Sequence, residues 1–124
     1  MNKLQILVVE DDAPVRNLIT TTLKAHDYKH IIAENGDEAI RQASTCNPDI
    51  VLLDMNMPER DGLQGIMEIS KLDLGTKVLA LSGYDDADLI FRAMKIGAKG
   101  YVLKTMASAQ LIYAIEEVLG GKIY

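Results

Sequence analysis

The stretch LQILVVEDD, residues 4–12, joins a run of apolar residues directly to three acidic ones. A second apolar run, Ile50–Leu53, also ends in a carboxylate, Asp54, and Lys104 closes a third run. If these runs are neighbouring strands of a parallel sheet, their ends meet at one edge, because all such strands point the same way. The pattern therefore predicts a cluster of carboxylates and one lysine at that edge.

Carboxylates gathered in this way need a cation. Like charges a few ångströms apart in a partly desolvated pocket repel by several kcal/mol, so that either a proton is taken up or a cation enters. Mg²⁺ prefers hard oxygen ligands, and it is usually held by one or two carboxylates together with phosphate oxygens. We therefore predict that Glu10, Asp11 and Asp54 form a Mg²⁺ pocket suited to metal-assisted phosphate chemistry.

Five apolar runs alternate with five helical patterns along the chain, which is typical of an α/β domain with a parallel sheet. The runs are Leu4–Val9, His30–Ala33, Ile50–Leu53, Val78–Leu81 and Gly100–Leu103. The first, third and fourth are almost continuous in Ile, Val and Leu, as expected for strands that are covered on both faces. We expect these three to be central, the polar second run to lie at an edge, and the sheet to have the order 2-1-3-4-5.

The helices are predicted from apolar residues spaced at three and four positions. Their apolar faces contain Val15, Leu18, Ile19 and Leu23; Ala39, Ile40, Ala43 and Cys46; Leu63, Ile66, Met67 and Ser70; Leu89, Ala93 and Ile96; and Leu111, Ala114, Ile115, Val118 and Leu119. Asp12, two residues before Pro14, is expected to cap the first helix. Phe91 points away from the core side of the fourth helix, which makes it a candidate contact for a partner.

Composition limits the class of protein. The 124 residues fit one domain, residues 1–124, with 48% hydrophobic and 25% charged residues. A formal charge of −5 argues against binding of nucleic acid by this domain, and no apolar stretch is long enough to cross a membrane, so we expect a cytoplasmic protein. Cys46 is the only cysteine, which excludes an internal disulfide, and we predict that it is buried in the core.

The segment DMNMPERDG, residues 54–62, follows the pattern D-x-x-M-P-x-x-D-G. Together with VVEDD at residues 8–12, it resembles the receiver domains of two-component response regulators. The segments LSGY at 81–84 and GAKGYVLK at 97–104 extend this resemblance over essentially the whole chain. The resemblance implies a flavodoxin-like (βα)5 fold, a three-layer sandwich around a parallel five-stranded sheet of order 2-1-3-4-5.

The resemblance also implies roles for single residues at the metal pocket. Asp54 would be the phosphoacceptor, which receives a phosphoryl group from the phosphohistidine of a sensor histidine kinase or phosphotransfer protein. Glu10, Asp11, Asp54 and the backbone carbonyl of Asn56 would hold Mg²⁺. The chain would thus be a regulatory phosphoacceptor domain, and it would promote only its own phosphorylation and dephosphorylation.

Three further residues are implied to turn the phosphate into a signal. Lys104 would pair with the phosphoryl group, the hydroxyl of Ser82 would bond the same oxygens, and Tyr101 would then turn inward. The fourth helix, fifth strand and fifth helix would change as a result. The family commonly has a proline where this chain has Thr105, so we expect the loop after Lys104 to be looser or set differently.

The end of the chain, residues 113–124, resembles receivers that continue into a LuxR-type helix-turn-helix domain. The chain is therefore expected to be part of a longer transcriptional regulator with a DNA-binding output domain beyond Tyr124. Dimerisation on phosphorylation, through the fourth or fifth helix near Phe91, is a further expectation from the family.

Three other functions remain open from the sequence. A phosphatase of the haloacid dehalogenase type would need a second acid two residues after the nucleophile, where this chain has Asn56. A flavodoxin would need a first loop rich in Ser, Thr and Gly to hold a phosphate, whereas this loop is acidic. An unphosphorylated receiver-like interaction module would use only the helical face, with a vestigial pocket.

Overall fold

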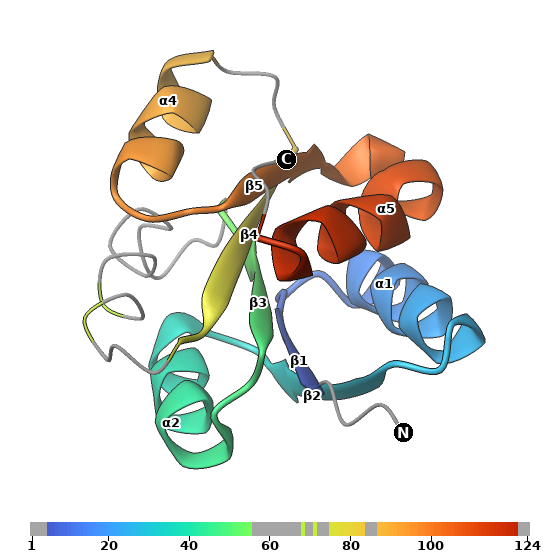
Figure 1. The fold of residues 1–124 in the computed structure, drawn as a ribbon. Helices are drawn as coiled ribbons and strands as arrows, with labels where there is room; N and C mark the ends of the chain where they lie inside the picture. The colour runs from blue at the N-terminus through green and yellow to red at the C-terminus, as the bar shows by residue number, and fades with distance from the viewer. Residues whose placement is uncertain (1–4, 56–67, 69–70, 72–74, 84–86, 122–124) are drawn as a thin grey trace.

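The computed structural model describes residues 5–55, 68, 71, 75–83 and 87–121 of the chain. Within these residues a five-stranded parallel sheet forms the centre of the molecule (Figure 1). Its strands are β1 (Gln5–Val9), β2 (Lys29–Ala33), β3 (Ile50–Asp54), β4 (Lys77–Ser82) and β5 (Gly100–Leu103). The order is β2-β1-β3-β4-β5, which confirms the predicted order, the three central strands and the polar edge strand.

Helices cover both faces of the sheet and give three layers (Figure 1). Helices α1 (Ala13–Ala25) and α5 (Ala107–Leu119) lie on one face, and α2 (Gly36–Cys46) and α4 (Ala87–Lys95) lie on the other. A short 3-10 turn, η1 (Lys104–Met106), joins β5 to α5. The helix predicted around Leu63–Ser70 lies largely outside the described residues.

The sheet has a separate apolar core on each face because alternate residues of a strand point to opposite sides. Ile6 and Val8 of β1 pack with α1 and α5, while Leu7 and Val9 pack with α2 and α4. All four side chains are fully buried. At about 1.5–3 kcal/mol for each buried large aliphatic side chain, these strands make a large contribution to stability. The paired strands also hold their carboxyl-terminal residues at fixed positions relative to one another.

Two helix starts differ in how they are capped. Asn35 is the N-cap of α2, and its side chain accepts a hydrogen bond of 2.9 Å from the N–H of Glu38. The Glu38 carboxylate in turn accepts from the N–H of Glu34, the residue before the N-cap, at 2.8 Å. Asp12 occupies the N-cap position of α1 in an extended conformation, but its side chain makes no capping hydrogen bond. The prediction was right about the position of Asp12 and wrong about its side chain.

Leu18 and Cys46, which their spacing assigned to the core, are less buried than predicted. Leu18 of α1 is 42% exposed, whereas its neighbour Ile19 is fully buried. Cys46, the last residue of α2, is half-buried, and its thiol lies 3.5 Å from the side-chain oxygen of Gln42. Both residues sit at the margin of an apolar stripe, where a small rotation of the helix decides which side chain is covered. Among the described residues, no helix has the length and apolar character needed to cross a membrane.

Candidate functional site

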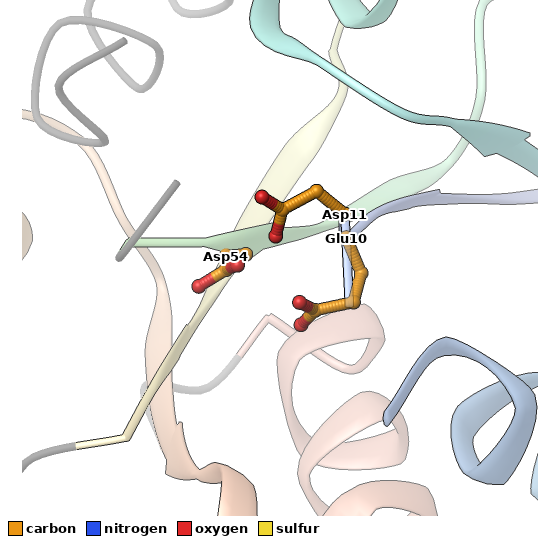
Figure 2. A group of neighbouring side chains, drawn as sticks. All are labelled: Glu10, Asp11 and Asp54. Carbon is orange, nitrogen blue, oxygen red and sulfur yellow. The ribbon is translucent and has the colours of Figure 1, made fainter. Parts of the chain in front are cut away.

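The strand register brings the predicted acidic residues together at the carboxyl end of the sheet. Val9 of β1 pairs with Leu53 of β3, so that the residues that follow them, Glu10 and Asp54, lie side by side. Figure 2 shows that the carboxylates of Glu10, Asp11 and Asp54 all point toward a common centre. One carboxylate oxygen from each lies within 4.8 Å of the others. The predicted cluster is therefore present in the structure.

Glu10 is held at both its backbone and its side chain, and it is fully buried. Its N–H donates to the carbonyl of Ala33 at 3.3 Å. Its Oε2 accepts hydrogen bonds of 3.2 Å from the N–H of Asp12 and from the amine of Lys104. Glu10 Oε1 lies 3.2 Å from the same amine but receives no hydrogen bond of acceptable geometry from the described residues.

Lys104 joins the cluster from the end of β5. Its Nζ lies 2.8 Å from Asp54 Oδ1, and both side chains are largely shielded from solvent, with exposed fractions of 16% and 1%. Burial alone would lower the pKa of the amine. The hydrogen bond and charge of Asp54, together with those of Glu10, outweigh this effect and raise the pKa of Lys104. The lysine therefore stays protonated and supplies one positive charge to the three acids.

The pKa of Glu10 is raised by its burial and by the excess of carboxylates over the single lysine. Burial, followed by the hydrogen bond and negative charge of Asp54, raises the pKa of Glu10 from 4.5 to about 7. Lys104 and the N–H of Asp12 act in the opposite direction but are outweighed. Near neutral pH the metal-free site thus takes up a proton on Glu10, which relieves the cost of burying its charge and its repulsion by Asp54.

The donor set fits a hard divalent cation. Three carboxylates from two neighbouring strand ends converge, and one buried oxygen, Glu10 Oε1, lacks a well-aligned hydrogen bond from the described part of the chain. A cation at their centre would replace the proton on Glu10 and balance the remaining negative charge. The acidic cluster can therefore hold a metal ion.

The other predicted site residues lie around this cluster or outside the described residues. Ser82, at the end of β4, is fully buried, and β4 is the neighbour of the strand that ends in Asp54. Tyr101 of β5 is half-buried and packs against the core on the α4 side of the sheet. Thr105 lies in the η1 turn. Asn56 is outside the residues that the structure describes.

Phe91 on α4 lies apart from the acidic cluster, and it is 64% exposed as predicted. The amine of Lys95, one turn further along the helix, lies 5.8 Å from the centre of its ring. This aromatic side chain belongs to the outer face of α4 and to neither core.

Arg16 is a part of the site that the sequence did not reveal. Its Nη1 donates to the backbone carbonyl of Glu10 at 3.1 Å and lies 3.7 Å from Glu34 Oε2. An arginine near the start of a helix is usually a solvated side chain. Only the path of the loop between Glu10 and α1 shows that this one turns back to the site.

Comparison with known proteins identifies the family. A model of the family described as "Response regulator receiver domain" matches residues 6–116. The chain therefore belongs to the response regulator receiver domain family, whose members are signalling domains of two-component systems. The resemblance inferred from the motifs is confirmed.

Individual relatives and solved structures agree with this assignment. The chain is 35% identical to the transcriptional regulatory protein YdfI of Bacillus subtilis (strain 168) over 125 residues, which cover 99% of this chain and 57% of YdfI. It is 34% identical to the chemotaxis protein CheY of Listeria monocytogenes over 92% of this chain and 97% of CheY. A LuxR-family two-component response regulator from Aurantimonas sp. SI85-9A1 superposes with a TM-score of 0.91 at 27% identity, covering 98% of this chain and 89% of the other. The chain thus spans little more than half of YdfI.

Proposed function

We propose that the chain is a phosphorylatable switch, in which Asp54 accepts a phosphoryl group from the phosphohistidine of a sensor histidine kinase or phosphotransfer protein. The observation that carries this proposal is the environment of Asp54. Its carboxylate is almost fully buried, lies 2.8 Å from the amine of Lys104 and faces the acids Glu10 and Asp11. A buried acid in such surroundings costs stability, so a functional reason for keeping it is needed.

The transfer is a displacement at phosphorus. An oxygen of the Asp54 carboxylate attacks the phosphorus atom and forms an acyl phosphate. The bond between phosphorus and the imidazole nitrogen of the donor breaks, and the electron pair stays on that nitrogen, which then takes a proton. Lys104 offers its charge to the phosphoryl oxygens, and such charge stabilisation is most of what the transition state needs. The domain promotes this step, and later hydrolysis, only on itself.

Glu10, Asp11, Asp54 and the backbone carbonyl of Asn56 would hold Mg²⁺ at the site. The ion supplies positive charge to the carboxylates and to the incoming phosphoryl oxygens. Glu10 must lose its proton for this role, and the raised pKa of Glu10 makes ion binding weaker as the pH falls below about 7.

The signal arises from the new charge on Asp54, about −1.5 to −2 for a bound phosphoryl group near neutral pH. Ser82, buried at the end of β4, would donate its hydroxyl to the phosphoryl oxygens. Tyr101 would then move inward from its half-buried place on β5, and the face made by α4, β5 and α5 would repack. The phosphate acts by favouring one of two arrangements that the domain already has.

The output of the switch is proposed to be transcriptional. YdfI is named a transcriptional regulatory protein, and the chain covers 57% of its length. We propose that a DNA-binding domain follows Tyr124 in the complete regulator, that residues 1–124 form its receiver, and that the protein acts in the cytoplasm. Phosphorylation would favour a homodimer or partner contact through the face that carries the exposed Phe91.

Beryllofluoride, which imitates a phosphoryl group on a carboxylate, tests the proposal. Adding it with Mg²⁺ should shift the amide NMR signals of the residues around Asp54 and of α4 and β5. Asp54→Asn should abolish these shifts, whereas Asp49→Asn, at the opposite end of β3, should keep them. If the parent protein does not respond, the phosphoacceptor assignment is wrong and an interaction module that needs no phosphate becomes the better explanation.

A further inference from the structure

Arg16 on α1 contacts the backbone that carries the acidic cluster. Its guanidinium is mostly shielded, with 17% of the side chain exposed, and Nη1 donates to the Glu10 carbonyl at 3.1 Å. The N–H of Glu10 is fixed on the other side by the carbonyl of Ala33. Glu10 is therefore held through both of its backbone polar groups, one of them by a side chain from the following helix.

The Glu10 carbonyl belongs to the same peptide plane as the nitrogen and Cα of Asp11. A peptide unit is rigid, so a hydrogen bond that fixes the carbonyl also fixes the direction in which the chain leaves Glu10. Asp11 lies beyond the end of β1, outside regular secondary structure, and is exposed. Of the three acids, Asp11 is therefore held least firmly by the sheet. Arg16 holds the peptide bond that precedes Asp11.

Arg16 is itself anchored on both sides. Its N–H donates to the carbonyl of Asp12 at 2.9 Å in the first turn of α1. Its Nη1 lies 3.7 Å from Glu34 Oε2, and the backbone N–H of Glu34 is bound to the side chain of Glu38 at 2.8 Å. The arginine thus links the loop after β1 to the loop after β2, and a single nitrogen, Nη1, makes both contacts.

We propose that Arg16 is a positioning residue for the divalent cation, which acts by holding the Glu10–Asp11 peptide so that Asp11 faces Asp54. This inference depends on the metal site proposed above. Residues that orient metal ligands typically change affinity by about 10–100-fold when they are replaced. A purely electrostatic role would act in the opposite direction, because removing a positive charge near the acids strengthens cation binding.

Titration calorimetry with Mg²⁺ on the parent, Arg16→Gln, Arg16→Lys and Glu34→Gln proteins separates these roles. Arg16→Gln should weaken Mg²⁺ binding by about tenfold or more. Arg16→Lys should also weaken it, because the charge remains but the shorter lysine side chain does not bring its amine to the position of Nη1. Glu34→Gln is the matched control, with an expected change within about twofold, because the exposed ion pair is weak and the bond to Glu10 remains. In the metal-free proteins, the Asp11 amide signal should shift in the two Arg16 variants.

Each result decides the question. Unchanged or tighter Mg²⁺ binding by Arg16→Gln, or parent-like binding by Arg16→Lys, would overturn the positioning role while leaving the metal site intact. If circular dichroism shows that Arg16→Gln is unfolded, Arg16→Lys gives the answer alone. If the parent itself binds no Mg²⁺, both this inference and the proposed metal site are wrong.

Discussion

Replacing Glu10 by glutamine should change how the stability of the metal-free protein depends on pH. The pKa of Glu10 is about 7 in the folded protein against 4.5 as its ordinary value. Between these values the folded state binds more protons at this position than the unfolded state does, so stability falls as the pH rises. The difference of 2.5 in pKa corresponds to a total loss on the order of 3 kcal/mol, at about 1.36 kcal/mol for each pKa unit.

Glutamine imitates the protonated acid and cannot ionise, so the variant should not lose this stability. The free energy of unfolding of Glu10→Gln, minus that of the parent, should grow by roughly 2–3 kcal/mol between pH 5 and pH 8. Burial lowers the pKa of His30, and this contributes stability that rises with pH in both proteins. The His30 contribution therefore cancels in the difference.

Urea unfolding in the presence of a chelator, followed by far-ultraviolet circular dichroism, measures this difference; the chain has no tryptophan for a fluorescence assay. Glu38→Gln is a suitable control for loss of a glutamate elsewhere, at the start of α2. Parallel pH curves for Glu10→Gln and the parent would show that Glu10 is already ionised in the metal-free protein. The explanation of the site by unbalanced negative charge would then be wrong.

Substitutions at three other positions test separate parts of the structure. Lys104→Met removes the cation beside Asp54, so that a buried charge loses its partner. The metal-free variant should be less stable than the parent at pH 8 by roughly 3 kcal/mol in urea unfolding. Equal stability of the two proteins would mean that the contact between Lys104 and Asp54 is broken in solution. Leu79→Ala opens a cavity at a fully buried position of β4 and should cost about 3 kcal/mol, and a loss below about 1 kcal/mol would contradict the packing. Asn35→Ala removes the side-chain cap of α2 and should cost about 1 kcal/mol, whereas Asn35→Asp should keep most of the stability.

The sheet could be predicted from the sequence because the apolar runs that indicate strands are local patterns that recur along the chain. Continuous apolar runs indicate strands that are buried on both faces, and the residue after each run must lie at the carboxyl end. This reasoning brought Glu10, Asp54 and Lys104 together correctly, and the register of β1 and β3 confirms it. The polar character of the second run was enough to place it at the edge of the sheet.

Contacts that depend on the path of a loop could not be predicted. Arg16 reaches the Glu10 carbonyl only because α1 starts at a particular angle after the acidic residues, and no residue pattern encodes that angle. The exposure of Leu18 depends on the rotation of α1 by a fraction of a turn. The raised pKa of Glu10 depends first on the burial of its carboxylate and then on its contact with Asp54, and spacing along the chain gives neither.

Intact mass spectrometry after incubation with acetyl phosphate tests the central claim most directly. With Mg²⁺ present, the parent should gain the mass of one phosphoryl group, and the gain should disappear when a chelator removes the ion. Asp54→Asn should gain nothing, while Asp49→Asn should behave like the parent. Equal labelling of Asp54→Asn and the parent, or no labelling of the parent at all, would contradict the assignment of Asp54 as the phosphoacceptor.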